Sequence, residues 1–252
     1  MPSLKEKSFK GVTWSFIDSL LGSGLSFLIG IILARLLSPS EFGQLGIIMV
    51  FLAFSNTLID SGFSTGLIRK AKCHAIEYDT VFWFNIIASF FLYWFLFFAA
   101  ESLSVFFSEP QLTPLLRFIG LVIIIDSLSL VPKARLIIKI DFKTQTIISA
   151  VSTLFGGILG VALALGGFGV WSLAVQIFVR QLLVCSLLWL FSDWRPLVRF
   201  SKVAFKELFG FGSKILGSQL IITLQNNIYY FVIGKFFSSL QLGYYTRAEQ
   251  FN

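Results

Sequence analysis

Charge and histidine are scarce in this chain of 252 residues. Only 13% of the residues are charged, roughly half the share typical of soluble domains, and His74 is the single histidine. Hydrophobic residues make up 56% of the chain and aromatic residues 17%, which is more apolar surface than a water-facing protein could cover. The composition therefore predicts a protein whose surrounding solvent is lipid.

Groups that carry enzyme chemistry are also missing. The two cysteines, Cys73 and Cys185, are too few and too far apart for a disulfide framework, and their spacing is not typical of a metal site. The sequence contains no Ser-His-Asp set and no paired-carboxylate constellation. We therefore expect no enzyme, no cofactor and no metal. The net charge of +7 does not indicate nucleic-acid binding, because the basic residues lie in short loops between apolar stretches.

Seven apolar stretches are long enough to cross a bilayer, and each must be a helix because lipid offers no hydrogen-bonding partner to the backbone. A further stretch beginning at Leu242 indicates the start of an eighth helix. The seven predicted spans are residues 11–34, 43–66, 80–100, 112–131, 145–165, 168–191 and 209–234.

The basic residues alternate from loop to loop. The first loop holds only Arg35, the third holds Glu101 and Glu109 without a cation, and the fifth is uncharged. Because Lys and Arg favour the cytoplasmic side, the N-terminus is predicted to be cytoplasmic, with Ser108 outside and Ala71 inside. Fourteen of the twenty Lys and Arg residues lie in the N-terminal tail and the second, fourth and sixth loops: Lys5, Lys7, Lys10, Arg69, Lys70, Lys72, Lys133, Arg135, Lys139, Lys143, Arg195, Arg199, Lys202 and Lys206.

An internal repeat is visible at an offset of 200 residues. Residues 34–43 read ARLLSPSEFG and residues 234–243 read GKFFSSLQLG. Both segments end a long helix and turn into the next, and six helices separate them. Because six is even, the two copies share one orientation, as in parallel transporter repeats. The matched positions are Arg35 with Lys235, Ser38 with Ser238, and Gly43 with Gly243.

Five stretches, in order along the chain, resemble Wzx-type polysaccharide flippases of the MATE-like superfamily. They read ILARLLSPSEFGQLG, GFSTGLIRK, VPKARLIIKIDFK, GFGVWSLAVQ and LGYYTRAEQF. The resemblance implies a polytopic helical bundle of two lobes around a central cavity. Residues 1–200 would form the N-terminal lobe of six helices, and residues 201–252 would begin the second lobe with the seventh helix. We expect the chain to be part of a protein about twice as long.

The resemblance also implies the substrate and the setting. Wzx-type proteins move oligosaccharides on a polyprenyl-pyrophosphate carrier from the inner to the outer leaflet for surface polysaccharide export. The expected location is the bacterial inner membrane, as a multi-pass protein. Lipid-linked oligosaccharide and membrane lipids are the expected partners, together with a polysaccharide polymerase and glycosyltransferases.

A cation lies in the middle of the predicted span 168–191. Arg180 follows Ser172 and Gln176 at four-residue steps, so the three share one helix face. A charge at this depth is costly, which indicates a function or a partner. Either the stripe faces a substrate cavity and Arg180 meets an anionic sugar or pyrophosphate, or Arg180 pairs with a buried acid such as Asp18 or Asp126.

The seventh predicted span carries two polar stripes. They either line a cavity or bond to neighbouring helices. Cavity candidates on this helix are Lys214, Gln225 and Asn226; the stripes are Lys214, Ser218 and Gln225 on one face and Gln219, Thr223 and Asn226 on another.

Asp18, near the cytoplasmic end of the first span, is a candidate for binding a coupling cation or proton, with a local hydrogen-bonded acid as the alternative. Asn56 and Asp60 are interpreted as interfacial caps. Glycines in two of the helices are expected to allow close helix approach: Gly22, Gly24 and Gly30 in the first, and Gly156, Gly157 and Gly160 in the fifth.

Three other functions compete with the flippase interpretation. A drug or small-cation exporter of the same fold would need an acidic cavity. A membrane glycosyltransferase or acyltransferase would need a catalytic carboxylate or histidine in a sizeable loop. A membrane scaffold without transport activity would need neither feature.

Overall fold

The computed structural model describes residues 4–60, 62–70 and 73–250, and the regular elements of that part of the chain are all α-helices. The predicted all-α bundle is therefore confirmed. In chain order the helices are α1 (Leu4–Leu36), α2 (Pro39–Asp60), α3 (Phe63–Arg69), α4 (Ala75–Phe107), α5 (Leu112–Ile119), α6 (Leu121–Ile138), α7 (Phe142–Leu165), α8 (Val170–Phe191), α9 (Lys202–Phe236) and α10 (Ser239–Gln250).

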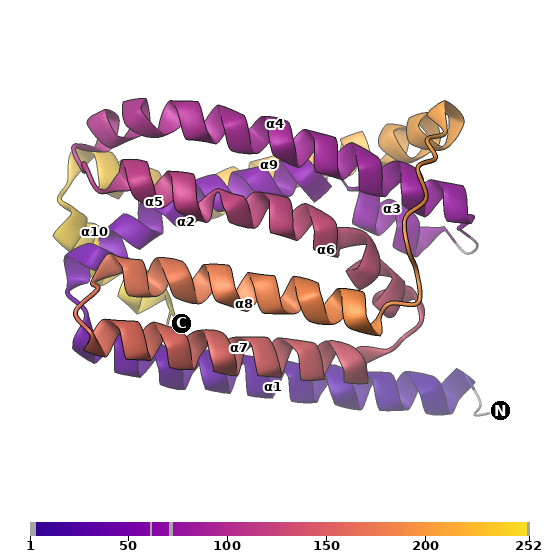
Figure 1. Ribbon diagram of the computed structural model, residues 1–252, viewed down its shortest axis with the longest axis horizontal. Coiled ribbons are helices and arrows are strands. Elements are labelled where there is room, and N and C mark those ends of the chain that lie inside the picture. Colours follow the sequence, from indigo (N-terminus) through magenta and orange to yellow (C-terminus); the bar gives the residue numbers. More distant parts are fainter. Residues whose placement is uncertain (1–3, 61, 71–72, 251–252) are drawn as a thin grey trace.

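The helices run along the long axis of the molecule, and their connections alternate between its two ends (Figure 1). One end holds the start of α1 and the α3–α4, α6–α7 and α8–α9 connections. We call it the basic end, because the alternating basic residues of the described chain lie in or next to these segments. The opposite end holds the α1–α2, α4–α5, α7–α8 and α9–α10 connections. This arrangement agrees with the predicted alternation. Which end faces the cytoplasm stays a prediction, and Ala71 lies outside the described residues.

Six of the seven predicted spans fall on helices that are long and apolar enough to cross a membrane. The seventh, 209–234, lies within α9, which is continuous over 35 residues but is not one of these six. Lysine and amide side chains lower its hydropathy, so its crossing stays a prediction. The six spans in the described residues are Phe16–Leu36, Pro39–Asp60, Ala75–Phe107, Leu112–Ile138, Phe142–Leu165 and Val170–Phe191.

The second predicted span, 43–66, was wrong at its C-terminal end. The long helix α2 ends at Asp60, and a separate short helix, α3, begins at Phe63. Between them Gly62 has φ +71°, a left-handed conformation that glycine adopts without a steric penalty. The Asp60 carboxylate accepts a hydrogen bond from the Ser64 N–H at 3.0 Å, which confirms the capping role predicted for this residue.

The largest buried apolar cluster lies between α2, α4, α5, α6 and α8. At its centre the short helix α5 and the start of α6 present leucine and isoleucine side chains that are fully buried. Leu242 of α10 also belongs to this cluster, so the cluster joins six helices and packs the start of the second repeat against the first part of the chain. Its most buried members, each 0% exposed, are Ala100, Leu112, Leu115, Ile119, Ile123, Ala174 and Leu242.

The glycines of α7 behave as predicted, and those of α1 do not. A Cβ added at Gly156 would come within 2.9 Å of the Arg180 Cβ on α8, and one at Gly157 would collide with the Ile29 side chain on α1. On α1, by contrast, a Cβ at Gly22, Gly24 or Gly30 would meet nothing within 4 Å. The prediction was wrong for α1 because its glycine-bearing face borders open space instead of a neighbouring helix.

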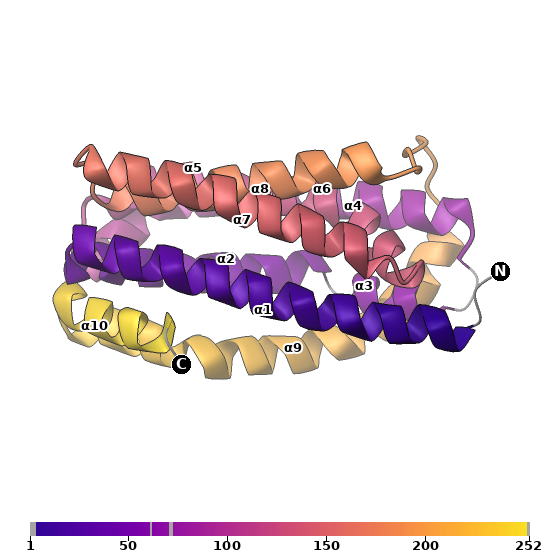
Figure 2. The same ribbon diagram turned by 90° about the horizontal axis from the view of Figure 1, so that it is seen from below.

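The predicted repeat has a matching local structure in both copies. The Ser38 N–H donates to the Glu41 carboxylate at 2.6 Å, and the Ser238 N–H donates to the Gln241 amide oxygen at 3.4 Å. Each contact is one half of a capping box at the start of a helix. The two helices that begin here, α2 and α10, pack against each other (Figure 2).

Candidate substrate cavity

A cavity of about 910 Å³ lies between α1, α2, α7 and α8. Its wall is apolar along α2, where Phe42, Leu45 and Met49 line it, and combines polar and apolar side chains along α1 and α8. A volume of this size lies at the upper end of the range for ligand sites, and hydroxyl, amide and charged groups can all hydrogen-bond to a carbohydrate. The polar lining consists of Asp18, Ser19, Ser23, Ser26, Ser149, Thr153, Gln176 and Arg180.

Arg180 and Gln176 both line this cavity from α8, on the stripe that the sequence predicts. The glycines of α7 lie directly behind them. Cβ atoms added at Gly156 and Gly160 would each come within 2.9 Å of the Cβ of Arg180 and Gln176, respectively. The small residues of α7 thus let α8 approach closely, with its two polar side chains at the edge of the cavity.

Arg180 does not form the structural ion pair that the sequence left open. Among the described residues, the nitrogen–oxygen pairs within 4.0 Å involve neither Arg180 with Asp18 nor Arg180 with Asp126. The Asp126 carboxyl interacts instead with the side chains of Asn56 on α2 and Gln181 on α8. Arg180 is exposed, so its guanidinium is available to a ligand in the cavity.

Asp18 lines the same cavity from α1 and is half-buried. One row of hydroxyls, Ser19, Ser23 and Ser26, follows it along the helix. The structure therefore brings the predicted coupling residue and the predicted substrate residue to one cavity. Binding of an ion by Asp18 stays a prediction.

Ser172 is the part of the predicted stripe that the cavity does not include. Its side chain is 0% exposed, and its hydroxyl donates to the Gly169 carbonyl at 2.5 Å. The reason is its position in the first turn of α8, where a serine hydroxyl satisfies a local backbone acceptor.

Thr153 is a cavity residue that sequence reasoning missed. It is 4% exposed, and its hydroxyl has no hydrogen-bond partner among the described residues. Buried hydroxyls are usually paired, so an unpaired one at a cavity wall is available to water or a ligand. The available signal was the four-residue step between Ser149 and Thr153, which places both on the face that carries Gly156 and Gly160.

The three candidates on α9 do not line this cavity. Lys214, Gln225 and Asn226 are exposed, and whether they line a substrate path stays a prediction. The second polar stripe of α9 bonds partly to a neighbouring helix, since the Thr223 hydroxyl lies 2.9 Å from the Thr57 hydroxyl of α2. Gln219 borders a smaller cavity of about 330 Å³ with Asn56, Thr57, Asp60, Gly62, Thr65 and Ile215.

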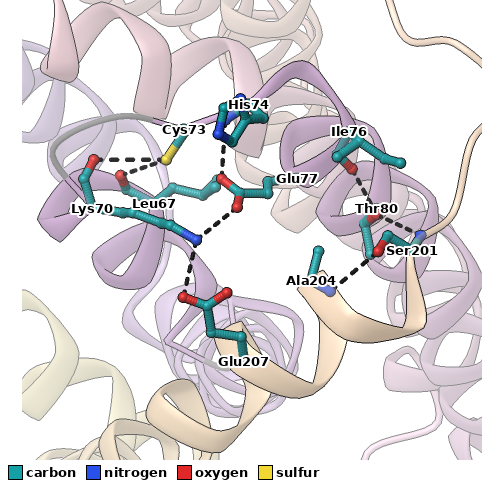
Figure 3. Close-up of polar contacts among 10 residues, drawn as sticks. All are labelled: Leu67, Lys70, Cys73, His74, Ile76, Glu77, Thr80, Ser201, Ala204 and Glu207. Carbon is teal, nitrogen blue, oxygen red and sulfur yellow. Dashed lines mark hydrogen bonds and ion pairs between the residues drawn. The ribbon is translucent and has the colours of Figure 1, made fainter.

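At the basic end a polar network joins α9 to α4 and to the residue that follows α3 (Figure 3). The Lys70 ammonium donates to Glu77 at 2.7 Å and to Glu207 of α9 at 2.9 Å, and these hydrogen bonds raise the pKa of Lys70. Nearby, the Ser201 N–H donates to the Thr80 hydroxyl at 3.0 Å. The start of α9 is thereby tied to the start of α4.

Cys73 lies beside this network. Its thiol donates to the Leu67 carbonyl at 3.3 Å, and burial raises the pKa of the thiol above its ordinary value. Because the thiolate is the reactive form, a raised pKa makes this cysteine a poor nucleophile at neutral pH. In the described part of the chain there is also no group of three or more His, Cys, Asp or Glu that could hold a metal ion.

The fold and the cavity define a multi-pass helical membrane protein with a polar internal site. The chain belongs to the family of polysaccharide biosynthesis proteins, whose family model matches residues 32–252. This match confirms the resemblance to polysaccharide transporters.

Three curated relatives are similar to nearly the whole chain. The succinoglycan biosynthesis transport protein ExoT of Rhizobium meliloti is 30% identical over 99% of this chain and 51% of its own length. The teichuronic acid biosynthesis protein TuaB of Bacillus subtilis is 25% identical, over 99% and 52%. The lipopolysaccharide biosynthesis protein WzxC of Escherichia coli is 24% identical, over 98% and 50%. The chain therefore spans about half the length of these relatives. No solved structure matches it.

Proposed function

We propose that this chain forms part of a transporter that moves polyprenyl-pyrophosphate-linked oligosaccharides from the inner to the outer leaflet of the bacterial inner membrane. Transport proceeds by alternating access, with the N-terminus in the cytoplasm. The observation that carries the proposal is Arg180, a cation without an acidic partner in the described structure, on the wall of a hydroxyl-rich cavity.

The chemistry of the cavity suits a glycan with an anionic group. A charge near the centre of a bilayer costs about 2.5–3.5 kcal/mol on insertion scales, so an unpaired arginine there needs a wet cavity or a ligand. Its planar guanidinium matches the oxygens of phosphate and carboxylate. The serine rows and Thr153 offer donors and acceptors to sugar hydroxyls.

The competing functions have less support. A drug or small-cation exporter would be served by an acidic cavity, whereas the charged residues lining this one are Asp18 and Arg180. A glycosyltransferase would need a catalytic group in a sizeable loop, yet the connection between α8 and α9 spans only residues 192–201. The names of two relatives point to transport or biosynthesis of succinoglycan and teichuronic acid, which agrees with a glycan substrate.

The partners follow from this proposal. Glycosyltransferases would assemble the lipid-linked oligosaccharide on the cytoplasmic face, and a polymerase would use it on the other. The substrate itself would enter the cavity from the membrane lipids that surround the bundle.

A flipping assay with Arg180 variants tests the proposal. The whole transporter of which this chain forms part is reconstituted in liposomes with a labelled polyprenyl-pyrophosphate oligosaccharide, and exposure of the label on the opposite leaflet is measured. We expect Arg180→Ala to lower the rate about tenfold or more, because a hydrogen bond to a charged group is lost, and Arg180→Lys to retain part of it. Arg199→Ala, in the exposed α8–α9 connection, is the matched control and should transport normally. An Arg180→Ala protein that inserts and transports at the full rate would contradict the proposal.

A further inference from the structure

The cavity is closed at one end and open at the other. Toward the opposite end of the bundle, its lining residues Leu33, Phe42 and Leu45 are 2%, 1% and 4% exposed. Further toward the basic end, Ser19 and Arg180 on its wall are exposed. The buried side chains therefore prevent a ligand in the cavity from leaving past the α1–α2 turn. Any helix that packs on the outer side of Phe42 helps to keep this end closed.

Phe42 packs against Leu33 and Leu173 in an apolar cluster formed by the cavity helices themselves, and α10 adds a further contact to its ring. The Arg247 guanidinium lies over the Phe42 ring, 4.7 Å from its centroid, and also donates to the Leu37 carbonyl at the end of α1. One side chain of α10 thus contacts both the cavity wall and the end of α1. The Arg247 Nε is buried and has no partner among the described residues, so the guanidinium is held by few bonds.

Near Arg247, the helices that begin the two repeat copies, α2 and α10, contact each other through their backbones. A Cβ added at Gly43 would collide with the Ser239 carbonyl, and one at Gly243 would collide with the Pro39 carbonyl. The contact is reciprocal: position 43 meets the start of the second copy, and position 243 meets the start of the first. One turn further along α2, a Cβ at Gly46 would come within 2.6 Å of the Thr246 hydroxyl.

The contact between α2 and α10 lies along one face of α10. Glycines let the two backbones approach closely, and the fully buried Leu242 joins the largest apolar cluster at this contact. Among the described residues of α10, the buried ones are Leu242, Gly243 and Thr246, which form a single face. Separation of α2 from α10 would therefore break the contact along this face and the bonds of Arg247, and would uncover the part of Phe42 that α10 covers.

We propose that the crossing of α2 and α10 at Gly43 and Gly243 is the gate that closes this end of the cavity, with Arg247 as its latch. The inference deepens the proposed function, on which it rests, because it names the contact that must separate before a substrate leaves toward the opposite end. Glycine at both positions makes the seal tight, and the latch arginine joins the two repeats across it.

Accessibility of the cavity from the opposite end tests the gate. In a background of Cys73→Ser and Cys185→Ser, a cysteine at Ser26 on the cavity wall is labelled with a membrane-impermeant maleimide applied from that side. We expect Gly243→Ala to raise the labelling rate about tenfold, since an overpacked crossing disfavours the closed state. Arg247→Gln should raise it several-fold. Gly217→Ala on α9, where a Cβ would meet nothing within 4 Å, is the matched control and should leave it unchanged.

The melting temperature in detergent reports whether each variant is folded, and labelling from the basic end should fall where labelling from the opposite end rises, because the two open states alternate. Equal labelling from the opposite end in Gly243→Ala, Arg247→Gln and Gly217→Ala would overturn the gate. Should Gly243→Ala fail to insert, the double variant Gly46→Cys/Thr246→Cys decides the question. Its disulfide should stop transport and a reductant should restore it, whereas transport that continues after oxidation would overturn the gate. Because labelling needs no transport, failure of the proposed function would leave the accessibility result intact.

Discussion

Helices α1 and α7 lie side by side, and each carries three glycines, yet the two sets have different roles. On α7 the glycines meet neighbouring helices on two sides, α8 at Gly156 and Gly160 and α1 at Gly157. On α1 the glycines meet nothing within 4 Å, and all three line the cavity. A glycine in a membrane helix can therefore bring a backbone close or leave room for a ligand. The neighbouring helices, and not the glycine itself, decide which.

The largest effect is expected at Gly156 of α7. Its nearest neighbours across the helix contact are the Arg180 Cα and Cβ and the Gln176 carbonyl, which belong to or adjoin the backbone and cannot rotate away. Gly156→Leu should destabilise the protein by about 3 kcal/mol, the upper end for overpacking, and displace Arg180. Intrinsic tryptophan fluorescence during heating in detergent measures the change. An unaltered melting temperature would show that α7 and α8 do not touch here.

A smaller effect is expected at Gly157, where the obstacle is the end of the Ile29 side chain. Because that side chain can change rotamer, Gly157→Ala should cost about 1 kcal/mol. The double variant Gly157→Ala/Ile29→Ala removes the obstacle, so the added methyl should cost much less in that background. Equal costs in the two backgrounds would contradict the assigned contact.

Gly24 of α1 should show almost no loss. A methyl group there meets open space, so Gly24→Ala should change stability by less than about 0.5 kcal/mol, and the better helix propensity of alanine favours a gain. The same melting experiment measures it. A loss as large as that of Gly157→Ala would mean that α1 packs its glycine face against another helix.

The smallest effect on stability is expected for an ion pair made by Lys139, in the connection between α6 and α7. Lys139 and Asp193 form an exposed ion pair at 2.6 Å, and this pairing lowers the pKa of the Asp193 carboxyl. A lowered pKa means that the pair contributes stability above the ordinary pKa of aspartate and loses it as the pH falls through the folded-state value. Asp193→Asn should therefore lower the melting temperature slightly at neutral pH, and the difference should shrink as the pH falls below the ordinary pKa of aspartate, about 3.9. A difference that persists in acid would contradict this origin.

Much of the fold could be predicted from the sequence, because apolar length and loop charge are strong signals. Six predicted spans, the alternation of connections and the 200-residue repeat all appear in the structure. The end of the second span could not be predicted, since the helix stops at a left-handed Gly62 inside an otherwise apolar stretch. The seventh span was harder, because its lysine and amides make its hydropathy ambiguous.

The cavity was predictable only in part. Arg180, Gln176 and Asp18 stand out because charge and amide groups are rare in apolar helices. Ser19 and Thr153 do not stand out, since serine and threonine also bond to their own helix backbone. The Ser172 hydroxyl bonds to the backbone carbonyl of Gly169. Its position on the same helix face as Arg180 did not indicate this bond. Which polar groups meet across helices depends on helix rotation, which the pattern along one helix does not specify.

The central claim is that the cavity between α1, α2, α7 and α8 holds the lipid-linked glycan. Protection from labelling tests it most directly, in the background of Cys73→Ser and Cys185→Ser. A cysteine at Gln176, on the cavity wall, and one at Arg199, in the α8–α9 connection outside the cavity, are labelled with and without a polyprenyl-pyrophosphate oligosaccharide. The account predicts that the ligand slows labelling at Gln176 and leaves labelling at Arg199 unchanged. Equal labelling at Gln176 with and without a ligand that the protein demonstrably binds would contradict it.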